Sequence, residues 1–194
     1  MSWITESDLN SAQANVRLAQ ALAAAQWNPA RVALPQDVLS KVTELVIPEG
    51  THPEVQNVRY QYDMSPYKNG LFAKMPNLKK VVIGNRTALP SYYFAFLKAE
   101  EVQVPVDIAD VDDRPSNLFT NSSVKRVLVT APSSPCDWEE LARDGRSLFW
   151  ESKIQSIRFA EGIECVPRNC CYGCSVLESV ELPRSCRIIG CYAF

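Results

Sequence analysis

One apolar pattern recurs along the chain from residue 42 onwards. Each copy has an apolar residue, two variable residues, and then two apolar residues separated by a single position, as in Leu78, Val81 and Ile83. Alternation of this kind is typical of a β-strand with one buried face. The copies are Val42/Leu45/Ile47, Leu78/Val81/Ile83, Ala99/Val102/Val104, Val124/Val127/Val129, Ile154/Ile157/Phe159 and Leu177/Val180/Leu182.

A further apolar residue stands a few positions before most of these copies. These residues, which we expect to fill the interior of each unit, are Phe72, Phe94, Phe119, Phe149 and Cys171. Aligning Ile154 with Leu177 also aligns Cys165 with Ile188, so each unit contains a second short apolar segment after its strand. The unit is therefore a strand, a turn, a second apolar segment and a buried side chain.

Units of this length, recurring every 20 to 36 residues or so, cannot enclose a core individually and must stack on each other. The sequence predicts an α/β repeat over residues 36–194, a right-handed solenoid of about six coils with a parallel β-sheet on one face. Ile157 should then lie beside Val180 as neighbouring rungs. Residues 186–194 are apolar and resemble an incomplete last coil, so we expect a continuation of the natural chain or another molecule to cover them.

Residues 1–35 follow a different pattern and form a separate predicted unit. Thr5 with Asp8 resembles a capping box, and Asn28 with Pro29 ends the helical spacing, which predicts a helix from about 6 to 26. We expect this helix to cap the first coil with one apolar stripe. The stripe with helical spacing consists of Leu9, Ala12, Val16, Ala19 and Ala23.

The last copy has a recognisable signature. Residues 177–194, LESVELPRSCRIIGCYAF, resemble the L-x-x-V-x-L-P-x-S-x-x-x-I-G-x-x-A-F unit of the BspA-like (Treponema pallidum type) leucine-rich repeats. The resemblance extends to residues 154–175, less closely to 78–96 and 124–129, and departs from the pattern at 99–119. It implies a leucine-rich-repeat solenoid that recognises a protein or a surface, in a family that includes bacterial surface adhesins.

The N-terminal segment has a second, shorter resemblance. The stretch W-I-T-E-x-D-L and the later LPQDVLSKVTELV are similar to the start of small phage head-to-tail adaptor proteins. This similarity implies a prophage origin and a structural or adhesive role in a virion as an alternative function.

Composition narrows the class of protein. Of 194 residues, 46% are hydrophobic and 22% are charged, and the formal net charge of −2 argues against nucleic acid as a partner. No apolar run approaches the roughly 18 residues of a membrane span. The N-terminus lacks the basic and apolar regions of a secretory signal, so the chain as written is expected to be cytoplasmic, with the cell surface or a virion as alternatives.

Catalytic chemistry finds little support in the sequence. His52 is the only histidine, and a nucleophile would have to reach it from a distant coil. The seven glycines are scattered singly, so no phosphate-binding loop is present. We therefore expect neither an enzyme nor a cofactor.

The seven cysteines all lie in the last part of the chain, and their odd number fits a disulfide framework badly. Cys171, Cys174, Cys186 and Cys191 could supply four thiolates to a zinc ion. In the repeat alignment, however, Cys171 takes the place of Phe194 and Cys186 that of Ile163, both of them apolar positions. Buried, reduced thiols are the preferred interpretation, and a zinc-stabilised interaction module is the alternative.

The outward face of the sheet is the candidate binding surface. Side chains between the buried strand positions point to the opposite face. One column reads Glu44, Lys80, Glu101, Arg126, Ser156 and Ser179, and a second reads Val46, Val82, Gln103, Leu128, Arg158 and Glu181. The alternating charges of the first column should pair across strands about 4.8 Å apart.

The second column places Val46, Val82 and Leu128 on a face that should contact water. Such a strip is typical of an interaction surface, although β-propensity alone could account for it. The predicted partner-binding residues are Val46, Lys80, Val82, Glu101, Gln103, Arg126, Leu128, Arg158 and Glu181. Tyr60, Tyr62 and Tyr67 form a second candidate set, although packing of their loop against the flank of the solenoid is the preferred interpretation.

The sequence thus predicts a non-catalytic protein-binding scaffold with a protein or cell-surface partner. The uncovered last coil offers a second route, namely self-association.

Overall fold

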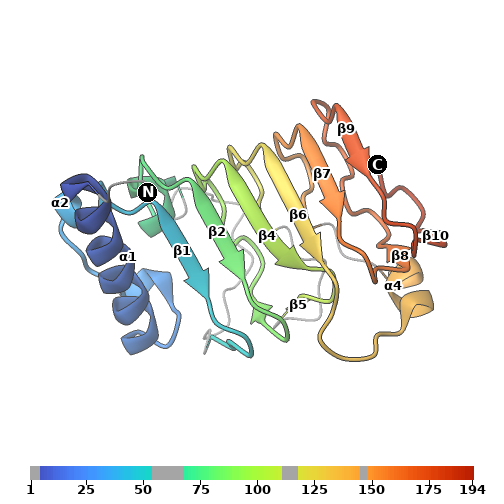
Figure 1. Ribbon diagram of the computed structural model, residues 1–194, viewed down its shortest axis with the longest axis horizontal. Coiled ribbons are helices and arrows are strands. Elements are labelled where there is room, and N and C mark those ends of the chain that lie inside the picture. Colours follow the sequence, from blue (N-terminus) through green and yellow to red (C-terminus); the bar gives the residue numbers. More distant parts are fainter. Residues whose placement is uncertain (1–4, 54–67, 111–117, 145–147) are drawn as a thin grey trace.

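Six parallel strands form the main sheet of the computed structural model, which describes residues 5–53, 68–110, 118–144 and 148–194. Neighbouring strands follow each other along the chain, so every coil contributes one rung (Figure 1). In sheet order they are β1 (Glu44–Ile47), β2 (Lys80–Ile83), β4 (Glu101–Pro105), β6 (Arg126–Thr130), β7 (Ser156–Phe159) and β9 (Ser179–Glu181). The predicted α/β repeat with a parallel sheet on one face is confirmed.

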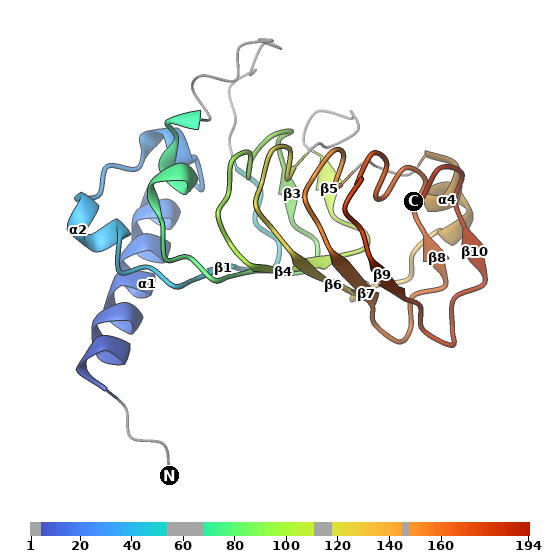
Figure 2. The same ribbon diagram turned by 90° about the horizontal axis from the view of Figure 1, so that it is seen from above.

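The return path of each coil lies behind the main sheet (Figure 2). Two short parallel pairs run there, β3 (Ala88–Leu89) with β5 (Ala109–Asp110), and β8 (Cys165–Val166) with β10 (Ile188–Ile189). A 3-10 turn, η2 (Leu71–Lys74), precedes β2, and the helix α4 (Trp138–Asp144) lies against β8 and β10. The described part of each coil is therefore mostly strand and turn, with little helix.

The strand register agrees with the apolar repeat. Ile157 lies beside Val180, and Cys165 lies beside Ile188, as the alignment of copies predicts. Ile157 is buried because the coils on both sides cover it, whereas Val180 in the last rung is 37% exposed. Burial of each apolar edge thus depends on the following coil.

Aromatic rings run through the interior from coil to coil. The ring of Phe94 lies 5.1 Å from that of Phe72 and 5.2 Å from that of Phe119, and Phe119 lies 5.3 Å from Phe149. All four side chains are buried, as is Cys171, which continues the column. The predicted interior residues are therefore confirmed, and the rings pack in the offset or tilted geometry that aromatic pairs favour.

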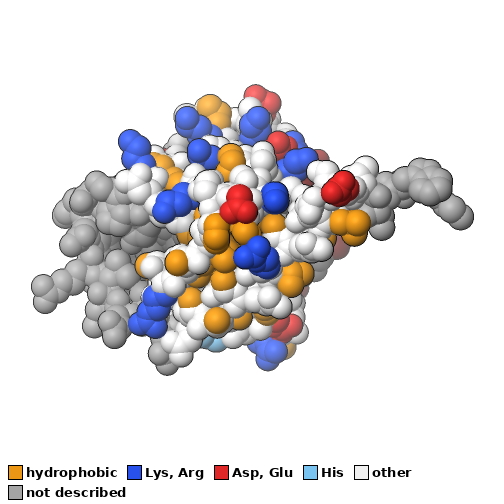
Figure 3. Space-filling view, turned by 90° about the vertical axis from the view of Figure 1, so that its left-hand side faces the viewer, with side chains coloured by type: hydrophobic (Ala, Val, Ile, Leu, Met, Phe, Trp, Pro, Cys, Tyr) orange, Lys and Arg blue, Asp and Glu red, His pale blue; other side chains and the backbone are white. Residues whose placement is uncertain are grey.

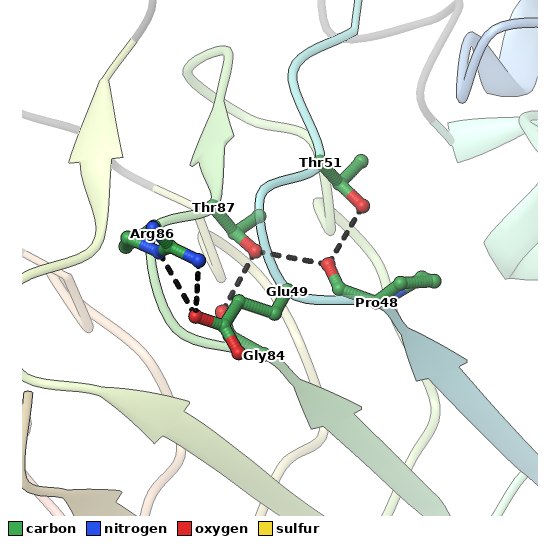
Figure 4. A network of polar contacts seen from close by, with 6 residues as sticks. All are labelled: Pro48, Glu49, Thr51, Gly84, Arg86 and Thr87. Carbon is green, nitrogen blue, oxygen red and sulfur yellow. Dashed lines mark hydrogen bonds and ion pairs between the residues drawn. The ribbon is translucent and has the colours of Figure 1, made fainter. Parts of the chain in front are cut away.

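Buried threonines stabilise the stacked turns that follow β1 and β2 (Figure 4). Thr51 Oγ1 donates to the carbonyl of Pro48 at 2.7 Å, and Thr87 Oγ1 lies 3.3 Å from the same oxygen. At the surface, an ion pair between Arg86 and Glu49, 2.8 Å long, bridges the two turns. Hydroxyls that bond to turn carbonyls satisfy backbone groups that the sheet does not reach.

The helix α1 (Glu6–Ala24) covers the first coil (Figure 2). Its capping box is confirmed, because the Asp8 amide donates to Thr5 Oγ1 and the Thr5 amide donates to the Asp8 carboxylate. Two shorter helical segments, η1 (Pro29–Arg31) and α2 (Gln36–Leu39), lead from α1 to β1. The Tyr93 hydroxyl donates to the Trp27 carbonyl at 2.7 Å and ties this segment to the solenoid.

The stripe by which α1 contacts the solenoid differs from the predicted one. Ala14, Leu18 and Leu22 are buried against the first coil, whereas Leu9 and Val16 are each 54% exposed. The prediction that the stripe of Leu9, Ala12, Val16, Ala19 and Ala23 covers the coil is therefore wrong. The helix carries apolar residues on two faces, and the two leucines of the inner face bury more apolar area than Leu9 and Val16 could.

Asn15, on the inner side of α1, accepts hydrogen bonds from the backbone at the start of the first strand. In the later rungs, two successive backbone N–H groups donate to one carbonyl of the rung before, as Lys79 and Lys80 do to Thr43 O at 2.8 and 3.2 Å. In the first rung the N–H groups of Thr43 and Glu44 donate to Asn15 Oδ1, at 2.9 and 3.2 Å. The side-chain amide oxygen of Asn15 takes the place of a preceding rung's carbonyl.

Replacing Asn15 should weaken the cap. Asn15→Ala removes the acceptor for two backbone donors, and we expect it to lower the free energy of unfolding by about 1–2 kcal/mol. Asn15→Asp keeps an acceptor oxygen and should cost less. Urea unfolding measures both, with Asn10→Ala on the exposed side of α1 as the control for helix propensity. Equal stability of Asn15→Ala and Asn10→Ala would contradict this role.

The aromatic column should dominate core stability. Phe119→Ala leaves a cavity between Phe94 and Phe149, and we expect it to cost about 3–5 kcal/mol. Phe194, which extends the column in the last coil, is 49% exposed, so Phe194→Ala should cost far less. Urea unfolding curves measure the free energy of unfolding of both variants. Similar losses of this free energy in the two variants would show that the rings do not form a continuous core.

Candidate partner-binding face

The predicted outward columns exist as neighbours in space. The β1–β2 and β2–β4 registers align Glu44, Lys80 and Glu101, and the later strands add Arg126, Ser156 and Ser179. Two positions further along each strand lies the second column, which consists of Val46, Val82, Gln103, Leu128, Arg158 and Glu181. We call the surface formed by these two columns the sheet face.

The charges of the first column largely neutralise each other. Arg126 Nε lies 2.8 Å from Glu101 Oε1, and Lys80 Nζ lies 3.9 Å from Glu44 Oε1. Arg126 also contacts Glu100 at 3.4 Å, a carboxylate that lies just before β4. The hydrogen bond and charge of Glu101 raise the pKa of Arg126. These side chains are therefore held by cross-strand ion pairs, as the alternating signs predict.

The second column keeps groups without such partners. Val46 is 50% exposed, and Val82 and Leu128 are half-buried. Within the part of the chain that the structure describes, Arg158 and Glu181 form no ion pair within 4 Å, although they lie side by side in register. The second column thus exposes apolar area and two charged side chains that make no ion pair within 4 Å among the described residues.

A shallow hollow of about 290 Å³ lies in the middle of the sheet face. Its lining brings together most of the predicted residues, including Gln103, Leu128, Arg158 and Glu181, whereas Val46 and Val82 lie outside it. Ser156 also lines the hollow, and it was absent from the predicted set. Its place in the first column, between Arg126 and Ser179, was the signal that could have identified it.

The four cysteines of the zinc hypothesis do not form one metal-binding cluster among the described residues. Cys171 is buried beside the half-buried Cys174, Cys186 donates to the carbonyl of Ile188, and Cys191 is exposed. Over residues 5–53, 68–110, 118–144 and 148–194, no group of three or more metal-binding side chains is placed to hold an ion. All seven cysteines are free thiols.

The buried thiols are held in their neutral form. Cys174 Sγ donates to the carbonyl of Phe149 at 2.9 Å and lies 3.4 Å from Ser152 Oγ. Hydrogen bonding to Cys170 and burial raise the pKa of Cys171, and hydrogen bonding to Cys171 raises that of Cys174. Burial raises the pKa of Cys165 to about 11. Thiols with raised pKa values are poor nucleophiles.

The remaining candidates lie apart from the sheet face. His52 is exposed in the turn region after β1. The predicted contact set of Tyr60, Tyr62 and Tyr67 lies outside the described residues.

The chain belongs to the family of BspA type leucine-rich repeat regions, whose model matches residues 50–134 and 139–194 with six repeat copies. This confirms the resemblance drawn from the last coil. Repeats of this family are generally protein-binding scaffolds and are typically non-catalytic.

Comparison with curated proteins and with solved structures identifies no relative of the chain. The family match begins after β1, so it does not include the N-terminal segment that resembles phage adaptor proteins, and that resemblance gains no support.

Every helix in the described ranges is too short or too polar to cross a bilayer.

The reactivity of each thiol should follow its burial and its pKa. At pH 8 we expect Cys191 to react with Ellman's reagent about tenfold faster or more than Cys165, Cys171 and Cys174, because burial and raised pKa values suppress the thiolate form. Unfolding in guanidinium should release all seven thiols. Cys191→Ser should remove the fast phase, and the control Cys186→Ser should retain it.

The same preparation tests the zinc hypothesis. Elemental analysis should find no stoichiometric zinc, and one zinc per chain together with thiols that react only after chelation would contradict our assignment.

Proposed function

We propose that this chain is a recognition module that binds a protein or cell-surface partner through the sheet face. The observation that supports the proposal most directly is the difference between the two columns. The charged side chains of the first column pair across strands, whereas the second column exposes Val46 and lines the shallow hollow with Leu128 and Arg158. The family's general role as a protein-binding scaffold points the same way.

The hollow suits part of a protein surface better than a small substrate. At about 290 Å³ it lies at the lower limit of ligand pockets, and the outward side chains of a regular sheet form its floor. An apolar side chain of the partner could pack on Leu128 and Val82, while polar groups meet Arg158 and Glu181. Apolar contacts surrounded by polar ones are the usual composition of a protein interface.

We propose no catalytic role for the sheet face. The only histidine is exposed in the turn region after β1, and the Cys171, Cys174 and Cys165 thiols carry raised pKa values. The scaffold resembles other repeat proteins in presenting a long surface whose specificity resides in its outward side chains.

Substitutions on the sheet face should separate binding from folding. A pull-down with the intact chain identifies a partner, and its affinity is then measured by calorimetry. Val82→Lys and Leu128→Lys should each raise the dissociation constant about tenfold or more, because each places a charge in the apolar part of the contact. Circular dichroism should show unchanged structure, since neither side chain belongs to the core.

Tyr172→Lys provides the matched control, because Tyr172 is exposed and lies in the last coils, away from the hollow. Partner affinity that is unchanged in Val82→Lys and Leu128→Lys but lost in Tyr172→Lys would contradict the assignment of the sheet face.

A further inference from the structure

Three cysteines lie together in one turn region of the later coils. The end of the molecule that α1 covers presents charged side chains of both signs among apolar ones (Figure 3), and the first cysteine of the sequence is Cys136. Cys170 and Cys171 belong to the buried core, and Cys174 packs against the same core. We call residues 171–174 the thiol turn.

The backbone of the thiol turn holds Cys171 and Cys174 at the separation that a disulfide requires. The amide of Cys174 donates to the carbonyl of Cys171 at 3.1 Å, which closes a four-residue turn. Gly173, the third residue, has a φ of +75°, as the third residue of a type II turn does. The first and last α-carbons of a β-turn lie less than about 7 Å apart, and disulfides join α-carbons about 4.4–6.8 Å apart.

Both side chains of the thiol turn point into the interior of the coil. Cys171 is buried, and Cys174 Sγ donates to the carbonyl of Phe149 at 2.9 Å and lies 3.4 Å from Ser152 Oγ. Hydrogen bonding to Cys170 raises the pKa of Cys171, and hydrogen bonding to Cys171 raises that of Cys174. The sulfur atoms of the thiol turn therefore lie within reach of each other.

The preceding coils place other residues at these two positions. A buried aromatic ring precedes a buried serine there, and the pairs are Phe119 with Ser122 and Phe149 with Ser152. Only in the coil of Cys171 and Cys174 are both positions cysteine. The second position already holds a small residue in the earlier coils, so a thiol there adds redox chemistry with little change in size.

We propose that Cys171 and Cys174 form a disulfide on exposure to hydrogen peroxide, so that the thiol turn is a site of reversible oxidation. The thiolate of one cysteine attacks a peroxide oxygen and breaks the O–O bond, which gives a sulfenic acid and a hydroxide that takes up the thiol proton as water. The thiolate of the other cysteine attacks the sulfenic sulfur and displaces a second hydroxide, which likewise leaves as water. Two thiols are thus oxidised to one disulfide, and one peroxide is reduced to two water molecules.

The surrounding groups keep hydrogen-bond partners after this oxidation. The carbonyl of Phe149 accepts the amide of Ser152 at 3.1 Å as well as the Cys174 thiol, so it retains a donor when the S–H group is lost. The Ser152 hydroxyl, which lies 3.4 Å from Cys174 Sγ, can still donate to that sulfur. Oxidation therefore leaves neither the carbonyl nor the hydroxyl unpaired.

Cys170 is excluded as the partner of Cys171. The peptide bond between them is trans, which fixes their α-carbons about 3.8 Å apart, closer than disulfides span. The remaining alternatives are a bond from Cys170 to Cys174, and one from Cys165 to Cys186, which lies near enough to influence the pKa of Cys165.

Peptide mapping after peroxide treatment tests the proposal. The intact chain is treated with hydrogen peroxide at pH 8, together with Cys191→Ser, which lacks the exposed thiol and so forms no disulfide between copies through it. Cys191→Ser should lose two hydrogen atoms in mass. Cleavage after Tyr172, which lies between the two cysteines, should leave two fragments that remain joined until dithiothreitol is added.

The rate of disulfide formation should rise about tenfold for each pH unit from pH 7 to pH 9. Hydrogen bonding and burial hold the pKa of Cys171 and of Cys174 above this range, so the thiolate fraction grows with each unit. The exposed Cys191 thiol of the intact chain provides the comparison, because its reaction with Ellman's reagent should be faster throughout this range.

Single substitutions distinguish the possible pairs. Cys171→Ala and Cys174→Ala should each abolish the disulfide, whereas the control Cys170→Ala should form it as before. A bond that is lost in Cys170→Ala, or one that maps to Cys165 and Cys186, overturns the proposal. Thiols that stay reduced after treatment, or that gain oxygen without a cross-link, do so too. Cys174→Ser, which restores the residue of the preceding coils, replaces Cys174→Ala if that variant fails to fold, and the map of Cys191→Ser decides independently of both.

Discussion

The structure depends on each coil completing the one before it. Two successive N–H groups at the start of a strand donate to one carbonyl of the preceding rung, and the same step places the next apolar residue over the last one. A single coil has neither a closed hydrogen-bond ladder nor a covered core. Its stability therefore comes from its neighbours, as expected for a repeat protein.

The first coil of such a stack has no preceding rung, so another element must cover it. At the first coil, α1 supplies both missing elements, because Leu18 and Leu22 cover the apolar edge and Asn15 Oδ1 accepts the two open N–H groups. The helix therefore takes the place of a preceding coil for both the core and the sheet.

The sheet face follows from the same geometry. Parallel strands in register place equivalent residues of successive coils side by side, so a column of alternating charges becomes a row of ion pairs. Those pairs stabilise the orientation of the charged side chains, and the neighbouring column is the part of the face that we propose contacts a partner. Specificity in such a scaffold depends on outward residues that the fold itself does not constrain.

The sequence alone determined the coil and its register. The spacing of apolar residues is set by the strand period, and repetition fixes which residues become neighbours, so the Ile157–Val180 and Cys165–Ile188 pairs and the Phe94–Phe119 contact could be predicted. Both columns of the sheet face followed by the same reasoning. Only the tertiary structure decided which stripe of α1 is buried, because the helix has apolar residues on two faces and the choice depends on the fit of Leu18 and Leu22 against the first coil. It also decided the role of Asn15, the place of Ser156 in the hollow and the contact of Cys174 with Phe149, since each depends on where a side chain meets another coil and not on its spacing along the chain.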